Sequence, residues 1–202
     1  MKISSKLLIA GGIVLALGVG LVLGFIGGVL ATKAGRAGFT SLLENERPAQ
    51  VAQPRVLARE QFQLQYPANW KLDREAKDFD PDHAFRIESP GSAFIMFRTG
   101  KATFEPEATL REYIAIFSKL MDRPTSTRFT QWGGFTGQGI ILHGRVLGIS
   151  TTIKPFVFNQ DGVSVIVVQH YLDEDQQAVL PGLKLVERTF TLKPVLPKKA
   201  EP

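Results

Sequence analysis

Two patterns of apolar residues divide the chain. Between Lys6 and Lys33 lie 26 residues without a charge or a proline, whereas apolar and polar positions are mixed in the rest of the sequence. A helix of that length, at ~1.5 Å per residue, spans about 39 Å, which exceeds the ~30 Å hydrocarbon core of a bilayer. Such a helix bonds all its backbone amides internally, as lipid requires. The pattern predicts a transmembrane helix over residues 7–32, after a short N-terminal tail of residues 1–6.

A cleaved signal peptide is the alternative interpretation of this stretch. Its apolar region would span about 7 to 15 residues and precede a small-x-small cleavage site. The stretch here is longer, and Thr32-Lys33-Ala34 is a poor cleavage site, so a retained anchor is favoured. The short tail carries Lys2 and Lys6, and the positive-inside bias therefore favours an extracytoplasmic C-terminal domain.

Small residues recur at every fourth position on one face of this predicted helix. They are Gly12, Ala16, Gly20, Gly24 and Gly28. Helices in lipid associate through close backbone packing, which small residues permit. One interpretation is self-association, or docking against another spanning helix. The other is that glycine is common in membrane helices and produces such spacings by chance.

The polar and apolar pattern also sets the domain boundaries. Residues 33–57 are predicted to form a juxtamembrane segment and linker, because the second half of this region is polar and carries Pro48 and Pro54. Residues 58–193 are predicted to form one folded domain. Residues 194–202 are polar and proline-rich, and we expect a disordered tail there.

The predicted domain opens with two hairpins. Apolar and polar residues alternate over residues 61–66, QFQLQY, which indicates a strand with one buried face. A turn at residues 67–69 predicts a return strand from Trp70. A second hairpin is expected over residues 85–97, with its turn at residues 89–92, Ser-Pro-Gly-Ser.

The period then changes to that of an amphipathic helix. Apolar residues fall at helical spacing at Leu110, Tyr113, Ile114, Phe117, Leu120 and Met121. Thr109 and Glu112 match a capping box at the start of this helix, and Pro124 follows its end.

A meander of strands and a second helix complete the predicted domain. Strands are expected at about residues 128–132, 135–142, 149–158 and 163–171, with a hairpin loop at residues 159–162, Asn-Gln-Asp-Gly. Three acids at residues 173–175 suit the first turn of a helix, which Pro181 is expected to interrupt. This order of elements predicts an α+β domain, an antiparallel sheet with helices on one face.

The arrangement resembles the PsbP/DcrB-like superfamily of α/β/α sandwich domains. The resemblance is carried by Y-P-x-x-W at Tyr66, Pro67 and Trp70, by the two hairpins, the central helix, the meander and the closing helix, over about residues 58–193. It implies an antiparallel sheet flanked by helices. It also implies a small extracytoplasmic accessory or partner-binding module, often tethered to a membrane and without a shared active site.

Composition removes several classes of function. The net charge is +5, but the predicted domain carries 16 basic and 16 acidic residues between Val56 and Lys193. A nucleic-acid-binding domain needs a basic surplus, so no nucleic-acid partner is expected. The chain has no cysteine, which excludes disulfides, thiolate catalysis and a lipobox.

The one metal-like spacing is D-x-D-x-D at Asp78, Asp80 and Asp82, followed by His83. An EF-hand loop would need glycine where His83 stands and glutamate where Ser89 stands, so a solvated acidic loop is the favoured interpretation. The alternative is a small-ligand or metal binder, or an enzyme, with a pocket near Asp78, Asp80 and His83.

The remaining candidate residues are histidines and tryptophans. His143 and His170 lie at the ends or edges of predicted strands, where a structural role is the more common one, and no GxSxG motif accompanies a serine. Trp70 is expected in the core beside Tyr66. Trp132 precedes two glycines and is predicted to form a surface contact.

These patterns lead to one functional hypothesis. The chain is predicted to be a membrane-anchored, non-enzymatic accessory or partner-binding domain, self-associating through its spanning helix. The expected partners are the lipid bilayer and a membrane or extracytoplasmic protein, and no cofactor is expected.

Overall fold

A computed structural model describes residues 46–76, 79–100 and 104–193. The chain divides into two compact units, residues 1–45 and residues 46–202. The predicted spanning helix, with its small residues Gly12, Ala16, Gly20, Gly24 and Gly28, lies outside the described residues. Within the described ranges, no helix is both long enough and apolar enough to cross a bilayer.

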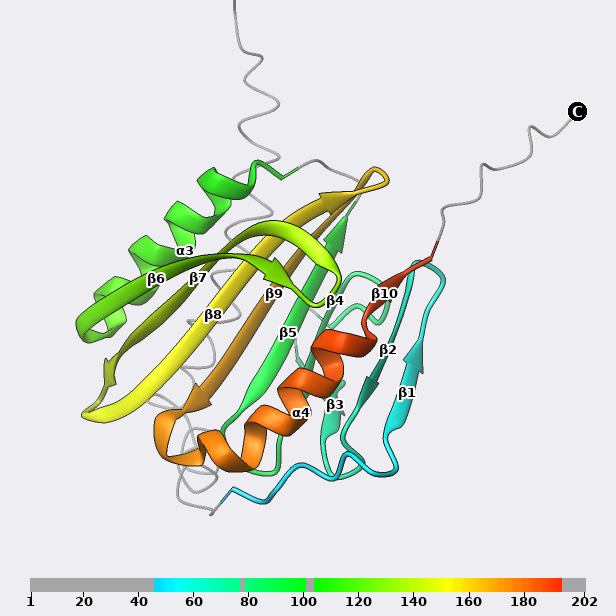
Figure 1. Cartoon of the computed structure of the whole chain (residues 1–202), viewed down its shortest axis with the longest axis horizontal. Helices are drawn as coiled ribbons and strands as arrows, with labels where there is room; N and C mark the ends of the chain where they lie inside the picture. Colours follow the sequence, from blue (N-terminus) through cyan, green and yellow to red (C-terminus); the bar gives the residue numbers. More distant parts are fainter. Residues whose placement is uncertain (1–45, 77–78, 101–103, 194–202) are drawn as a thin grey trace, which may run out of the picture. The chain divides into compact units, whose positions relative to one another are not determined.

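The described residues form two antiparallel sheets and two α-helices (Figure 1). The larger sheet has the order β3-β4-β5-β9-β8-β7-β6. Its strands are β3 (Lys71–Asp73), β4 (Ala84–Glu88), β5 (Phe94–Gly100), β6 (Asp122–Trp132), β7 (Phe135–Val146), β8 (Ile149–Gln160) and β9 (Val163–Leu172). The smaller sheet places β2 (Phe62–Tyr66) between β1 (Arg55–Ala58) and β10 (Thr191–Leu192).

The helices lie on opposite faces of the larger sheet. Helix α3 (Pro106–Leu120) contacts β6, β7 and β8, whereas α4 (Gln176–Thr189) contacts β9 and the smaller sheet. A short 3-10 helix, η1 (Asp173–Asp175), leads from β9 into α4. This arrangement matches the flanked sheet implied by the resemblance. The expectation from element order, that both helices lie on one face, is wrong.

An aromatic core fills the space between α4 and the larger sheet. The rings of Phe97 and Phe190 stack with centroids 5.2 Å apart, and Trp132 meets Phe190 edge-on at 5.6 Å. Trp132 is 1% exposed, so the predicted surface contact at this residue is wrong. The physical reason is the next residue: Gly133, with a φ of +56°, turns the β6–β7 hairpin toward α4, where its N–H donates to Glu187 Oε1 at 3.0 Å.

The N-terminal hairpin was predicted with the wrong partner. Strand β3 does follow the turn after Tyr66, but it pairs with β4, whereas β2 pairs with β1 and β10. Trp70, which lies between the two sheets in sequence, is 1% exposed and belongs to the same core as Tyr66. The predicted core position of Trp70 is therefore confirmed, and the chain changes sheets there.

Both helices differ from the sequence prediction, α3 at its start and α4 in its interior. Helix α3 starts at Pro106, where the missing N–H leaves no bond unmade. Thr109 already lies inside the helix and donates through Oγ1 to the carbonyl of Glu105 at 3.0 Å, so the predicted capping box is wrong. Pro181 lies within α4 without interrupting it. It is exposed, as is Gln177 one turn earlier, so water can bond the carbonyl that proline leaves unpaired.

The folded domain begins earlier than residue 58. The carboxylate of Glu46 accepts a hydrogen bond from Ser89 Oγ at 2.5 Å, and the N–H of Ala49 donates to the carbonyl of Ala178 in α4 at 2.9 Å. Residues 46–57, assigned to the linker from their prolines and polarity, are therefore part of this unit. Tertiary hydrogen bonds explain the difference, because they order a segment that has no apolar period of its own.

Candidate functional site

The acidic loop that suggested metal binding is held by its own turn. Asp80 Oδ1 accepts the N–H groups of Asp82 at 2.9 Å and His83 at 3.1 Å, and Asp80 Oδ2 lies 3.1 Å from His83 Nδ1. The Asp82 N–H bond, together with His83, lowers the pKa of Asp80 although partial burial opposes the shift. Asp78 lies outside the described residues. Among the residues that are described, no group of three acids or histidines could hold a metal ion.

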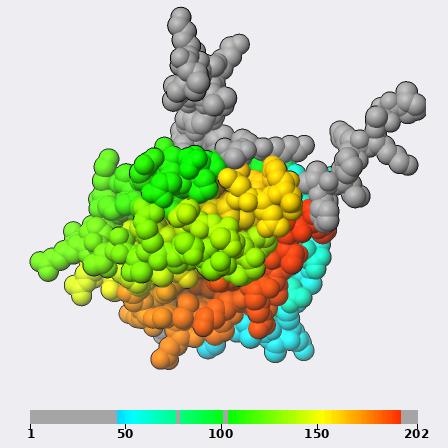
Figure 2. All heavy atoms as spheres, turned by 45° about the horizontal axis from the view of Figure 1, so that its top comes forward, coloured from blue at the N-terminus to red at the C-terminus, as the bar shows by residue number. Residues whose placement is uncertain are grey.

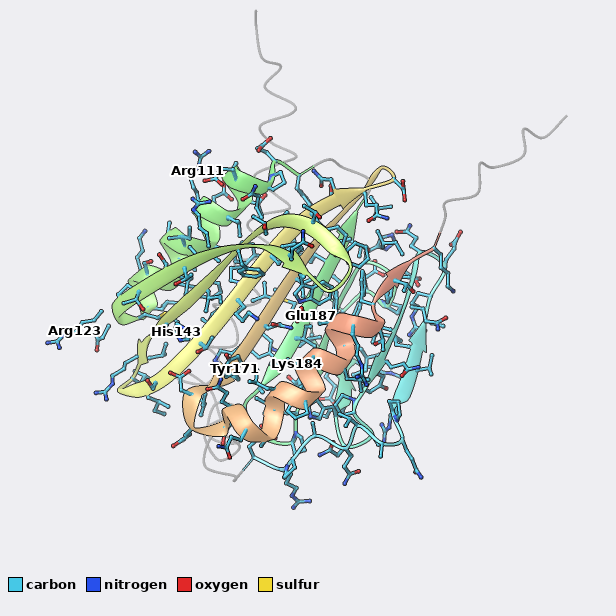
Figure 3. The ribbon with its side chains drawn as sticks, in the orientation of Figure 1. Arg111, Arg123, His143, Tyr171, Lys184 and Glu187 are labelled. Atoms are coloured by element: carbon cyan, nitrogen blue, oxygen red, sulfur yellow. The ribbon has the colours of Figure 1, made fainter. Side chains whose placement is uncertain are left out.

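A polar row crosses three neighbouring strands on the face that carries α4. His143 on β7 lies opposite Thr152 on β8, which lies opposite Tyr171 on β9, so their side chains project from one face. Thr152 Oγ1 is 2.8 Å from His143 Nδ1 and 2.5 Å from Asp173 Oδ1. Figure 3 shows His143 on β7 and Tyr171 on β9, the two strands that flank β8. The structure brings together four polar groups, of which the sequence singled out only His143.

The hydrogen bonds of this row fix which group donates and which accepts in each contact. Thr152 has one hydroxyl proton, which it donates to Asp173, so His143 Nδ1 carries a proton and donates to Thr152 Oγ1. The His143 side chain itself is exposed. Thr152 itself is 0% exposed, and no substrate could reach its hydroxyl. Burial raises the pKa of Tyr171, and the neighbouring Thr152 side chain opposes that shift. The row can orient the imidazole of His143. The Thr152 hydroxyl is buried and therefore cannot act as a nucleophile on a substrate.

Lys154 lies two residues beyond Thr152 and therefore on the same face of the sheet. Its ammonium sits 5.5 Å from the centroid of the Phe129 ring. Burial lowers the pKa of Lys154, the carboxylate of Glu187 opposes this, and the charge of Lys184 adds to it. Figure 3 shows Lys184 and Glu187 along α4. The exposed side of α4 also lines a shallow hollow, at Gln176, Gln177, Leu180, Pro181 and Lys184.

His170 ties β9 to the β4–β5 turn. Its Nδ1 lies 3.1 Å from the carbonyl oxygen of Ser92, and its ring stacks on Phe94 with centroids 4.8 Å apart. Burial lowers the pKa of His170 to about 4, which the Ser92 carbonyl opposes and the nearby Arg86 charge reinforces. A neutral imidazole in this position is a structural element.

Sequence reasoning missed the polar row because its members are far apart in the chain. Thr152 and Asp173 are separated by 21 residues and share no local motif. Alternation along the strands could have assigned a face to each residue, but only the strand register brings them into one line. The candidate residues Gly12, Ala16, Gly20, Gly24 and Gly28 lie outside the described residues.

Comparison with known proteins yields fold neighbours only. No protein-family model matches the sequence, and no curated protein matches it. Solved structures with similar folds include LpqN, involved in cell envelope biogenesis in Mycobacterium tuberculosis, at 13% identity and a TM-score of 0.45, covering 70% of this chain and 91% of that one. CyanoP, the cyanobacterial PsbP of Synechocystis, matches at 10% identity and 0.45, covering 71% and 94%. A protein of unknown function from Pseudomonas aeruginosa matches at 10% and 0.41, covering 71% and 100%. The described residues themselves form antiparallel sheets with two α-helices, an α+β fold.

Proposed function

We propose that the chain is a membrane-tethered, non-enzymatic module that binds a protein partner at the extracytoplasmic surface. The observation that carries the proposal is the uncharged run between Lys6 and Lys33. It is long enough to span a bilayer as a helix. The described domain follows it from Glu46 onward. Tethering raises the local concentration of the domain beside a membrane partner, so a small interface suffices for binding.

The chemistry of the described domain supports a binding role over catalysis. The hydroxyl of Thr152 is buried and already bonded on both sides. Asp80 and His83 hold a surface turn. The Lys154 ammonium lies over the Phe129 ring and is attracted by the carboxylate of Glu187. Each of these polar groups has a partner inside the fold, and none is aligned with a reachable nucleophile.

The second part of the proposal is self-association through the spanning segment. Gly20, Gly24 and Gly28 form two overlapping GxxxG steps. Such steps let two helices approach closely in lipid, where packing and interhelical hydrogen bonds replace the hydrophobic effect as the driving force.

Flotation with membranes tests the tether. The full chain should float with phospholipid vesicles and resist extraction at alkaline pH. Val19→Arg places a charge in the middle of the run and should reduce membrane recovery, because a charge at the bilayer centre opposes insertion by roughly 2.5 to 3.5 kcal/mol. Val56→Arg, at a side chain 57% exposed on β1, is the matched control and should float normally. Recovery of the wild-type chain from the soluble fraction would overturn the proposal.

Oligomeric state in detergent tests self-association separately. The wild-type chain should run as a dimer or higher oligomer, and Gly24→Ile should shift it toward monomer because the side chain blocks close packing. Leu23→Ile changes the neighbouring residue without filling the small-residue face. An unchanged monomer in wild type and both variants removes self-association and leaves the tether intact.

A further inference from the structure

Strand β8 is preceded and followed by hairpin turns that have nearly the same backbone conformation. The turn between β7 and β8 has Leu147 at a φ of 53° and Gly148 at 84°; the turn between β8 and β9 has Asp161 at 51° and Gly162 at 76°. Two-residue turns with positive φ at both positions favour Asn-Gly and Asp-Gly. Asp161-Gly162 follows this rule. Leu147 breaks it, because a bulky residue is rarely found at positive φ.

Leu147 is also exposed. Its side chain is 65% exposed, and among the large hydrophobic side chains that the structure describes only Val56 is comparably exposed. Val146 and Ile149, which pair across the base of the turn, are partly buried apolar neighbours. A leucine here strains the backbone and is exposed to water. A turn-forming residue such as Asn or Asp would stabilise the fold more. Strain of this kind is retained where another role requires it.

Basic side chains flank this apolar tip. Arg145 is exposed on β7 and lies opposite Asp122, the first residue of β6. Arg123 follows it, exposed and with a φ of 50°, and Figure 3 shows it pointing away from the domain. In Figure 2 the green start of β6 and the yellow-green β7–β8 region project from the same edge. The acids of η1 follow Leu172, which is opposite Thr151, so they lie at the same end of the sheet; Asp173 accepts a hydrogen bond from Thr152 there.

The first residue of the described domain, Glu46, is held at the end of the sheet that carries Leu147. Register places Thr151 opposite Leu172 on β9, and His170 opposite Phe94 at the start of β5. The β4–β5 turn before Phe94 therefore shares this end with the β7–β8 turn. Glu46, where the described domain begins, is bonded to Ser89 in that β4–β5 turn. The Asp161 turn lies at the opposite end of β8.

We propose that the Leu147 turn is a lipid-contact tip, which seats this end of the domain on the bilayer to which the chain is tethered. The side chain of Leu147 enters the boundary between headgroups and acyl chains, flanked by Val146 and Ile149. Arg145 and Arg123 bond lipid phosphates, as cations beside an interfacial apolar element do. The inference rests on the proposed tether, and it adds an orientation: the Asp161 end points away from the membrane.

Site-specific fluorescence in vesicles tests the tip. The chain has no cysteine, so Leu147→Cys and Asp161→Cys each give a single labelling site at equivalent turn positions. Each labelled full-length chain is reconstituted into phosphatidylcholine vesicles, with and without phosphatidylglycerol, that contain a brominated lipid as quencher. Quenching should be several-fold larger at residue 147 than at residue 161, and larger still with phosphatidylglycerol. Arg145→Gln in the Leu147→Cys background should remove only the phosphatidylglycerol increment.

Flotation of the same samples separates the two proposals. Labelled chains that fail to float contradict the tether. Chains that float but quench equally at residues 147 and 161 overturn the tip alone. Shielding of residue 147 that requires added membrane protein, and is absent in pure lipid, also overturns it, because the tip would then contact a protein. Leu147 is exposed, so its substitution leaves the core intact, which the circular dichroism of each variant confirms.

Discussion

The two turns that flank β8 have the same backbone conformation and opposite surface chemistry. At one end Asp161 and Gly162 obey the preferences of a two-residue hairpin turn; at the other, Leu147 holds the same conformation against them. Asp161 needs no explanation beyond folding. Leu147 does, because its shape and its exposure are both unfavourable. Both turns require a residue with positive φ at their first position. The turn whose residue is unfavourable in that conformation, Leu147, is the better indicator of function.

The largest expected difference between the two ends comes from His170, which lies near the Leu147 end. Its pKa in the folded domain is about 4, below the usual 6.5. The unfolded chain therefore binds more protons between these values. The stability that His170 provides is complete above pH 6.5 and is lost as the pH falls toward 4. With partial exposure taken into account, we expect a loss of about 2 kcal/mol.

Urea unfolding of the full chain in mild detergent measures this loss, followed by the fluorescence of the buried Trp70 and Trp132. His170→Phe keeps a ring against Phe94 and should flatten the change between pH 6.5 and 4.5. An identical pH profile in wild type and variant would show that His170 is already protonated or exposed in the fold.

A smaller effect should come from the second turn residue, and it should be equal at both ends. A Cβ added to Gly148 or Gly162 would meet no atom within 4 Å, so only the backbone opposes a side chain there. Gly148→Ala and Gly162→Ala should each lower the free energy of unfolding by about 1 to 2 kcal/mol. Unequal losses would mean that the two turns do not share one conformation in solution. Gly134→Ala is the control, because Gly134 also has open space but no positive φ.

The smallest effect distinguishes the first turn residues and has opposite signs at the two ends. Leu147→Asn introduces a residue that tolerates positive φ, and should raise the free energy of unfolding by about 0.5 to 1 kcal/mol. Asp161→Leu should lower it by a similar amount. The same Leu147→Asn variant should lose its preference for lipid contact. A stabilised variant with undiminished contact would separate the strained turn from the proposed tip.

Much of the larger sheet follows from local sequence signals. Alternation and the Asn-Gln-Asp-Gly loop predicted the β8–β9 hairpin, and Ser89–Ser92 predicted the β4–β5 turn, as the register confirms. Helix α3 was predicted because the spacing of Leu110, Tyr113 and Phe117 is helical, and all three are buried. These elements carry their own period and their own turn residues.

The smaller sheet could not be predicted in the same way. Strand β10 has two residues, and it pairs Thr191 with Gln63 across most of the domain. The prediction of the first hairpin was wrong for a related reason: β2 pairs with β1 and β10, and not with β3, the strand that follows it. The row of His143, Thr152 and Asp173 could not be predicted either, because its members are also far apart in the sequence. Pairings over long sequence distances leave no periodic trace.

The ordering of residues 46–57 has a consequence for how far the domain could move from the proposed anchor. If the anchor ends at residue 32, only residues 33–45 separate it from Glu46, which the β4–β5 turn holds in place. Thirteen residues span at most about 45 Å when fully extended, against roughly 85 Å for the 25 residues first assigned to the linker. If the chain is tethered as proposed, a connection of that length would hold the start of the described domain within about 45 Å of the end of the anchor. The domain could then bind only partners close to the membrane surface.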